Sequence, residues 1–386
     1  MRFTEICFRT FFVLMKALRG PRRRQGLPQT VLVLQYAMPV GCCVHGTPLL
    51  AAIRSARPDV TIIVATHGNG LAALLHDPYI DHLIETPAMT SRWKVFAIAG
   101  FLRKRLRQKG LQPDIVLQDA SSVGGSYALL ALVLRVAPTA GFAHAPLLYD
   151  IHLDYDLSLS LLDNTLRLAP LVGAESAHLE PAIYFSEADL DTARALLREV
   201  NPADLPLVGF VVQGRGPKSS RWPEEHFAEV LRYVRSLGYC AVFLGIASDT
   251  ERIDRVRTLA GGYGASLAGR TSIPELTAVL CLCDLLVTLD TGIMHVARST
   301  DLPMVVLGTA WQEPLEWMPL NKKNVRIIRG EEYEDLPVGY HTHRIDVNDV
   351  LQAIAELRHA YPASSHARDW RVSHRLSTRS ATPRNS

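Results

Sequence analysis

The chain has 386 residues, of which 48% are hydrophobic and 20% are charged. This composition is typical of a folded globular protein and excludes disordered and collagen-like chains, and the length predicts two domains rather than one core. The formal net charge is only +3, and no uninterrupted apolar stretch is long enough to span a bilayer.

The positive charge is concentrated at the two ends of the chain. Residues 1–24 carry seven Lys and Arg against one acid, and residues 363–386 carry five Arg against one acid, so the ends hold +10 and the remainder −7. Nucleic-acid enzymes usually carry their basic charge on the folded body, so we expect no nucleic-acid partner. From residue 362 onward Ser, Arg and Thr dominate, which predicts a disordered basic tail over 362–386.

Residues 1–27 form a basic arm that also contains apolar side chains. They lack the long apolar core and the cleavage site of a secretory signal. One interpretation is an amphipathic helix that binds an anionic membrane surface. The alternative is a disordered extension or a misassigned start codon. The six cysteines include no C-x-x-C pair, so buried thiols in a reducing compartment are expected rather than a zinc or redox site.

The first half of the chain alternates between strand-like and helix-like patterns. Strands are predicted over 31–34, 60–64, 81–84 and 113–117, and helices over 45–56, 72–75 and 91–109, the last one basic and amphipathic. A turn through Pro39, Val40 and Gly41 is expected between the first strand and the first helix. This alternation predicts a parallel sheet with helices on both faces, in a first domain over 28–200 whose end is less regular.

The second half repeats the alternation. Strands are predicted over 207–212, 241–245, 285–289 and 304–308, and helices from Pro223, over 293–298 and over 350–357. The sequence therefore predicts a second α/β domain over 201–335 and a closing helix region over 336–361.

The stretch from Cys283 to Ala310 carries the clearest functional signal. An apolar run ends at Asp290-Thr291-Gly292, a short helix pattern follows, and a second apolar run ends at Gly308. The polar residues therefore stand at the carboxyl end of a buried strand, where a helix start can receive an anion and a glycine permits close approach. Asp290 and Thr291 suit the capping of an ordinary helix equally well.

This stretch resembles the donor-site motif of the heptosyltransferase family of glycosyltransferases. The motif is Asp-(Ser/Thr)-Gly-x-x-His-x-Ala followed by a strand that contains proline, and the matching residues are Asp290, Thr291, Gly292, His295, Ala297 and Pro303. The string RPDVTIIVATHGNGLAALLHDPYIDHLIE also resembles the family, and a weak match, QDASSVGGS, agrees only at Asp119 and Ser126. The matches extend from about residue 31 to residue 310.

The resemblance implies a GT-B fold, in which two Rossmann-like doubly wound domains face each other across a cleft. It implies an inverting transfer from a nucleoside-diphosphate sugar, ADP-heptose in the best-known members, to a saccharide on lipid A or a related lipid-linked acceptor. Such enzymes need no metal or other cofactor. An Asp-x-Asp sequence, Asp154-Tyr155-Asp156, is present, but it lies in a segment predicted to be irregular rather than at a strand end. It also implies a location in the cytoplasm, at the inner face of the cytoplasmic membrane.

The donor diphosphate is expected between the helix that starts near Gly292 and the loop from Gly214 to Arg221. In the family a lysine of a Lys-x-Trp-Pro motif contacts the donor phosphates, but this chain has Ser220 at that position. The resemblance therefore implies that Lys218 or Arg221 supplies the positive charge. The alternative is that both residues belong to the start of an ordinary surface helix. The expected donor-binding residues are Gly41, Gly214, Gly216, Lys218, Arg221, Asp290, Thr291, Gly292 and His295.

The catalytic base is the point where the chain departs from the family. The family's turn after the first strand carries Gly-Asp, whereas this chain has Gly41-Cys42. Asp119, at another strand end, and His45, one helical turn further on, are the two candidates. A catalytically impaired relative that only binds a nucleotide or sugar remains the alternative. A dehydrogenase is disfavoured because no Gly-x-Gly-x-x-Gly follows the first strand.

Overall fold

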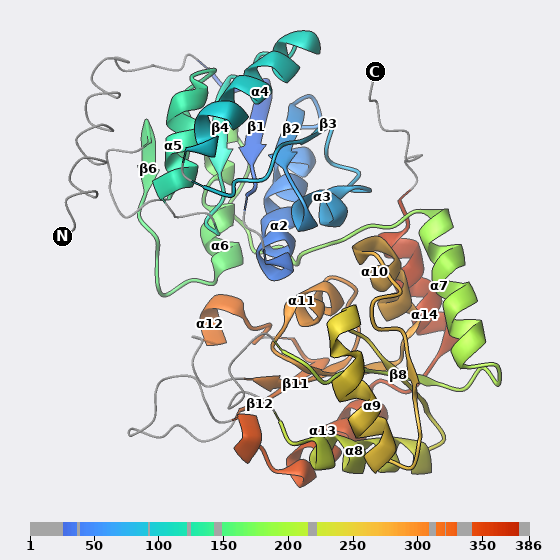
Figure 1. The fold of residues 1–386 in the computed structure, drawn as a ribbon. Helices are drawn as coiled ribbons and strands as arrows, with labels where there is room; N and C mark the ends of the chain where they lie inside the picture. The colour runs from blue at the N-terminus through green and yellow to red at the C-terminus, as the bar shows by residue number, and fades with distance from the viewer. Residues whose placement is uncertain are drawn as a thin grey trace. The chain divides into compact units, whose positions relative to one another are not determined.

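The computed structural model describes residues 26–36, 39–91, 93–121, 125–142, 149–214, 222–308, 314–320, 322–329 and 342–377. These residues form two compact units, one within Met1–Pro181 and one within Ala182–Ala381. Each unit contains a six-stranded parallel sheet with helices around it (Figure 1). Of the basic arm predicted over residues 1–27, residues 1–25 lie outside the described residues.

The first unit has the strand order β3-β2-β1-β4-β5-β6. The strands are β1 (Thr30–Leu34), β2 (Thr61–Thr66), β3 (His82–Glu85), β4 (Ile115–Gln118), β5 (Thr139–Phe142) and β6 (Ile151–Leu153), and the helices are α2 (Val40–Ala56), α3 (Asn69–Leu74), α4 (Lys94–Gln108), α5 (Gly125–Leu134), α6 (Leu161–Leu166) and η2 (Ala169–Val172). The chain runs outward from β1 to β3 and then returns to place β4 on the other side of β1. The topological switch point therefore lies between β1 and β4.

The second unit has the strand order β12-β11-β10-β7-β8-β9. The strands are β7 (Leu207–Val211), β8 (Cys240–Phe243), β9 (Ala265–Ser266), β10 (Leu285–Leu289), β11 (Met304–Gly308) and β12 (Val325–Arg329). The helices are α7 (Glu187–Val200), α8 (Glu224–Ser236), η4 (Ala247–Asp249), α9 (Thr250–Leu259), α10 (Ile273–Leu282), α11 (Gly292–Arg298), α12 (Pro314–Trp317), η5 (Thr342–Arg344), α13 (Val347–Ala360) and α14 (Ser365–Arg375). Here the switch point lies between β7 and β10.

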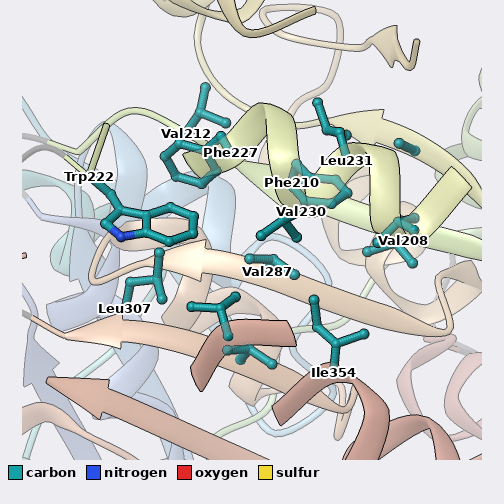
Figure 2. Close-up of a cluster of buried hydrophobic side chains, with 14 of the residues drawn as sticks. Val208, Phe210, Val212, Trp222, Phe227, Val230, Leu231, Val287, Leu307 and Ile354 are labelled. Carbon is teal, nitrogen blue, oxygen red and sulfur yellow. The ribbon is translucent and has the colours of Figure 1, made fainter. Parts of the chain in front are cut away.

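The core of the second unit is built around Trp222 (Figure 2). This side chain is fully buried, its ring packs edge-on against Phe227 with centroids 4.8 Å apart, and its Nε1 donates to the carbonyl of Ile345 at 2.9 Å. Satisfying the indole N–H makes the burial of so large a ring favourable. Trp222 therefore anchors the chain where it enters α8.

The start of α2 differs from the prediction. The helix begins at Val40, directly after Pro39, so the residues expected in a turn, among them Gly41 and Cys42, lie in its first turn. Nearly every residue from Gly41 to Ile53 is buried, and this packing outweighs the local preference of the Pro-Val-Gly sequence for a turn. The helix continues past Pro48, which has no N–H to donate to the carbonyl of Val44, and the hydroxyl of Thr47 donates to that carbonyl at 2.8 Å instead.

The boundary between the units lies between Pro181 and Ala182, rather than between residues 200 and 201. The sequence places α7 at the end of the first domain, but α7 packs against α10 of the second unit, as Figure 1 shows. The amphipathic pattern of α7 predicts a helix without saying which sheet it covers. Contacts between residues far apart in sequence decide its domain.

The predicted disordered tail is wrong for residues 365–375, which form α14. The Arg371 guanidinium, which is buried, donates from Nε to the carbonyl of Cys281 at 3.0 Å and from Nη2 to the carbonyl of Cys283. Arg375 donates to the carbonyl of Ser299. These arginines satisfy carbonyl groups of the second unit, so they order the segment instead of keeping it in solvent.

Candidate functional site

In the first unit, polar side chains are buried at the carboxyl ends of β1 and β4. Gln35 follows β1, Gln118 ends β4 and Asp119 follows it, and none of the three is more than 3% exposed. Ligands of open parallel sheets bind beside the carboxyl ends of strands at the switch point. The costly burial of polar groups therefore occurs at the edge where a ligand is expected.

The carboxylate of Asp119 lies against α2. The hydroxyl of Ser121 donates to its Oδ1 at 2.8 Å, and a Cβ added at Gly46 would stand 3.3 Å from its Oδ2 and 2.3 Å from Nε2 of Gln35. That Nε2 donates to the carbonyl of Cys43 at 2.9 Å. Glycine at position 46 therefore permits the close approach between α2 and the ends of the two strands.

The charge of Asp119 acts on several neighbours. Burial, followed by the charge of Asp119, raises the pKa of the Cys43 thiol and of the Tyr149 hydroxyl. Burial, Asp119 and then Cys42 raise the pKa of the Tyr127 hydroxyl. The Cys43 thiol therefore stays protonated near neutral pH and is unsuited to accept a proton.

The structure brings two of the three predicted catalytic positions to one place. Cys42, 7% exposed in the first turn of α2, and Asp119 both act electrostatically on Tyr127, which is half-buried on α5. His45 lies further along α2 and is 1% exposed. Tyr127 and Gln35 were not predicted from the sequence, although Gln35 is the polar residue at which the first apolar run stops.

Four buried polar atoms at the carboxyl ends of β2, β1 and β4 have no hydrogen-bond partner among the described residues. They are Oγ1 of Thr66, Nδ1 of His67, Oε1 of Gln35 and Oε1 of Gln118. Burial lowers the pKa of His67, so its ring is neutral at pH 7 and one ring nitrogen can accept a hydrogen bond. Buried polar atoms usually find partners, and hydroxyl groups of a bound sugar or of water could donate to these atoms.

In the second unit, the motif residues stand at the switch point as expected, but without capping contacts. Thr291 is the N-cap residue of α11 and its side chain makes no capping hydrogen bond. Oγ1 of Thr291 is buried without a partner in the described part of the chain, and no hydrogen bond to the Asp290 carboxylate occurs there. Helix capping therefore does not account for these two side chains.

Two titratable groups of this motif have strongly shifted pKa values. Burial raises the pKa of Asp290 to about 6. Burial, and then the positive charge of Arg298, lowers the pKa of His295 to about 3, so the imidazole is neutral at physiological pH. The ring of His295 lies edge-on to Trp317 of α12, with centroids 6.2 Å apart. Perturbed groups of this kind cluster at functional sites.

The segment after β7 lies beside the turn after β10. A Cβ added at Gly214 would stand 3.6 Å from Cγ2 of Thr291 and 3.7 Å from Cδ1 of Leu289. The structure thus brings together Gly214 and the Asp290–Gly292 turn, although 75 positions separate residues 214 and 289 in the sequence.

The structure does not place the remaining predicted donor-binding residues at this turn. Gly41 belongs to the first unit, in the first turn of α2. Gly216, Lys218 and Arg221 lie outside the described residues. Within the described ranges, no group of three or more His, Cys, Asp or Glu side chains could hold a metal ion. In the same ranges, no helix is long and apolar enough to cross a membrane.

The chain is similar to heptosyltransferases in sequence and to solved glycosyltransferase structures in fold. Lipopolysaccharide heptosyltransferase 2 of Salmonella typhimurium is 30% identical over 154 residues, and this match spans 38% of the chain and only 44% of that relative. A glycosyl transferase family 9 structure from Veillonella parvula is 22% identical, with a TM-score of 0.74 over 85% of this chain and 97% of that chain. The E. coli ADP-heptose LPS heptosyltransferase II structure is 21% identical, with a TM-score of 0.70 over 85% of this chain and 98% of that chain.

The structural likeness confirms the predicted fold class, two Rossmann-like α/β domains of the GT-B type. The family profile described as glycosyltransferase family 9 (heptosyltransferase) matches residues 100–341, which is more than half of the sequence. The chain therefore belongs to glycosyltransferase family 9, the heptosyltransferase family.

Proposed function

We propose that the protein is an inverting, metal-independent glycosyltransferase. It moves heptose or a similar sugar from a nucleoside-diphosphate donor of the ADP-heptose class to a lipopolysaccharide-type saccharide. Membership of the family supports glycosyl transfer, and the names of the Salmonella and E. coli relatives support this donor and acceptor class. The observation that carries the proposal is the Asp290–Gly292 turn at the switch point, whose side chains make no capping contacts.

The donor is proposed to bind at this turn in the second unit. Gly292 and Gly214 carry no side chain that would keep a diphosphate away from the backbone, and the hydroxyl of Thr291 can donate to a phosphate oxygen. Burial raises the pKa of Asp290 to about 6, so the carboxyl group still carries a negative charge in most molecules at pH 7 and would repel the diphosphate. We propose that the Asp290 carboxyl group accepts hydrogen bonds from hydroxyl groups of the donor sugar or of the ribose.

Lys218 and Arg221 are proposed to supply the positive charge for the leaving diphosphate. Replacing either residue by Ala should weaken ADP binding by about 1.5–3 kcal/mol, the range for a hydrogen bond to a charged group. Calorimetric titration of ADP measures this loss. If both single variants and the double variant bind ADP normally, the diphosphate does not lie at this loop.

Asp119 is proposed to act as the general base. As the acceptor oxygen forms its bond to the anomeric carbon, the bond from that carbon to the diphosphate breaks, and the hydroxyl proton passes to the Asp119 carboxylate. The hydrogen bond from Ser121 fixes this carboxylate, which stands at the carboxyl end of β4 beside the buried acceptor atoms of Gln35 and Gln118. Those atoms would orient the acceptor sugar by receiving its hydroxyl hydrogens.

The test compares Asp119→Asn with His45→Ala, using ADP-heptose and a lipopolysaccharide-type acceptor. Removing a general base typically costs a hundredfold to ten-thousandfold, so Asp119→Asn should lower kcat by several hundredfold while His45→Ala has a much smaller effect. ADP binding, measured by thermal shift, should be unchanged in both variants. Transfer that survives Asp119→Asn would refute this role. A wild type that binds ADP and transfers nothing across a panel of nucleotide sugars would identify the binding protein without catalysis.

A further inference from the structure

Helix α4 has an outward face that the proposed function does not use. Trp93, Phe96, Gly100, Lys104 and Arg107 are all exposed, and their spacing of three and four residues places them on one side of the helix. The opposite side carries Val95, Ile98, Ala99, Leu102 and Leu106, all of them buried. These five exposed positions are called the outer face of α4.

The amino-terminal half of the outer face is aromatic. Trp93 is 71% exposed and Phe96 is 40% exposed, and their rings lie nearly parallel with centroids 6.5 Å apart. The core beneath α4 is already filled by the buried side of the helix, so packing within the unit does not explain these two rings. Tryptophan is enriched where a protein meets the headgroup region of a bilayer, because its ring is apolar and its N–H is polar.

The remainder of the helix surface is positive and uncompensated. Lys94 and Arg105 flank the outer face, and residues 93–109 contain no Asp or Glu, nor does α5, which packs beside α4. In the part of the chain that the structure describes, Lys94, Lys104, Arg105 and Arg107 form no ion pair with an acidic side chain. This positive charge therefore complements an anionic surface.

We propose that the outer face of α4 docks the protein on an anionic phospholipid bilayer. The rings of Trp93 and Phe96 lie at headgroup level, and Lys104 and Arg107 lie against lipid phosphates. Each basic side chain adds attraction near an anionic membrane, and the aromatic rings add burial of apolar area. The helix is not itself immersed, because its apolar side belongs to the core of the unit. The proposal depends neither on the transfer reaction nor on the arm over residues 1–25.

A single-stranded nucleic acid is the other partner that basic and aromatic side chains can bind. Such proteins use a positively charged groove with aromatic side chains on which successive bases stack. On α4 the two aromatic residues are adjacent at one end, and the charges occupy the surface of one straight helix. This arrangement favours the flat surface of a bilayer.

The experiment measures co-flotation of the full-length protein with phosphatidylcholine vesicles that contain or lack phosphatidylglycerol. The wild type should float with the anionic vesicles, and high salt should weaken its binding. Trp93→Ala/Phe96→Ala and Lys104→Glu/Arg107→Glu should each lower the partition coefficient by about tenfold or more. Because all four side chains are exposed, thermal unfolding should be unchanged in both variants.

The controls carry matched changes in the second unit. Trp370→Ala removes a tryptophan of α14 that is 44% exposed, and Arg194→Glu/Arg198→Glu reverses two exposed charges on α7. Both controls should float like the wild type. The proposal is overturned if the α4 variants float normally, or if the controls lose as much binding. The proposal is also overturned if the wild type binds single-stranded RNA, the α4 variants lose that binding, and their flotation is unchanged.

Discussion

Three titratable residues at the two switch points, of which Asp119 and His295 are buried and Asp290 is partly buried, experience different electrostatic surroundings. Asp119 receives a hydrogen bond from Ser121 and acts on the pKa values of neighbouring thiol and phenol groups. Asp290 has a pKa raised to about 6 by burial, and His295 has a pKa lowered to about 3. Burying an uncompensated charge costs stability, which supports the proposal that the Asp290 carboxylate serves ligand binding rather than folding.

Replacement of Asp290 by Asn should stabilise the protein near neutral pH. The folded-state pKa of about 6 lies above the ordinary value of 3.8, so between these values the folded protein binds more protons than the unfolded chain. The contribution of wild-type Asp290 to stability therefore falls as the pH rises from about 4 to about 6. Above that window the penalty is at most about 3 kcal/mol, at about 1.4 kcal/mol for each pKa unit.

Thermal unfolding measures this effect. Asp290→Asn should raise the unfolding midpoint at about pH 7.5 and leave it nearly unchanged at about pH 4. Asp204→Asn, which changes an exposed carboxyl group in the same unit, should alter neither value. A destabilised Asp290→Asn protein at neutral pH would show that the carboxylate is needed for folding.

At the scale of single elements, helix α2 meets the ends of β1 and β4 at a glycine. A Cβ at position 46 would stand 2.3 Å from Nε2 of Gln35, whose hydrogen bond to the Cys43 carbonyl would break. The same Cβ would stand 3.3 Å from the carboxylate of Asp119. The helix therefore positions the proposed base as well as covering the sheet.

Gly46→Ala should destabilise the first unit by about 1–3 kcal/mol, the usual cost of overpacking, and should lower transfer activity by displacing Asp119. Gly100→Ala is the matched control, because position 100 lies inside α4 with nothing within 4 Å of an added Cβ. Gly100→Ala should raise the free energy of unfolding by about 0.5–1 kcal/mol, because alanine has a higher helix propensity than glycine. Denaturant unfolding and transfer assays of both variants check the pair, and equal effects would contradict the steric argument.

Helix α14 is held to the second unit chiefly by hydrogen bonds from arginine. Arg371→Ala removes the donors that satisfy the carbonyls of Cys281 and Cys283 and should destabilise the unit by about 2–4 kcal/mol. Asp369→Ala, on the exposed side of the same helix, should change stability by less than about 0.5 kcal/mol. Chemical denaturation of both variants measures the difference. A small effect of Arg371→Ala would mean that apolar packing alone holds α14.

At the scale of the whole molecule, positive charge is divided between folded and terminal segments. Three of the five arginines after residue 363, namely Arg368, Arg371 and Arg375, belong to α14 and contact the second unit. The tail therefore offers less free charge than its composition indicates. The outer face of α4 and the basic arm predicted over residues 1–27 are therefore the two positive segments that we propose for membrane binding.

Deletion of residues 1–25 should reduce flotation with anionic vesicles and leave thermal unfolding unchanged. Each Lys or Arg near such a surface contributes about 1 kcal/mol before screening, and residues 1–24 contain seven of them. Combining the deletion with Lys104→Glu/Arg107→Glu should reduce flotation further than either change does. Equal flotation of the full-length and truncated proteins would remove the arm from membrane binding.

The strand ends of the second unit at which we propose that the donor binds could be predicted from local sequence. The predicted strands over 285–289 and 304–308 coincide with β10 and β11, because buried parallel strands are continuous apolar runs that polar residues interrupt. The Asp290-Thr291-Gly292 turn follows directly from where the first run stops. This turn can be located in the sequence without knowing any contact with a distant segment.

The cluster of buried polar side chains at the strand ends of the first unit could not be predicted in this way. Gln35, Thr66 and Gln118 are far apart in sequence, and only the parallel pairing of β1 with β2 and with β4 places their side chains at one edge. The pKa of Asp290 likewise depends on how deeply the folded chain buries it.

The α/β class, the presence of two domains and the family resemblance could be predicted from the sequence, because these depend on local periodicity and on a contiguous motif. The start of α2, the sheet that α7 covers and the order of α14 could be known only from the folded structure. The physical reason is the same in each case. These features depend on packing and hydrogen bonds between segments distant in sequence, and such contacts outweigh local propensity.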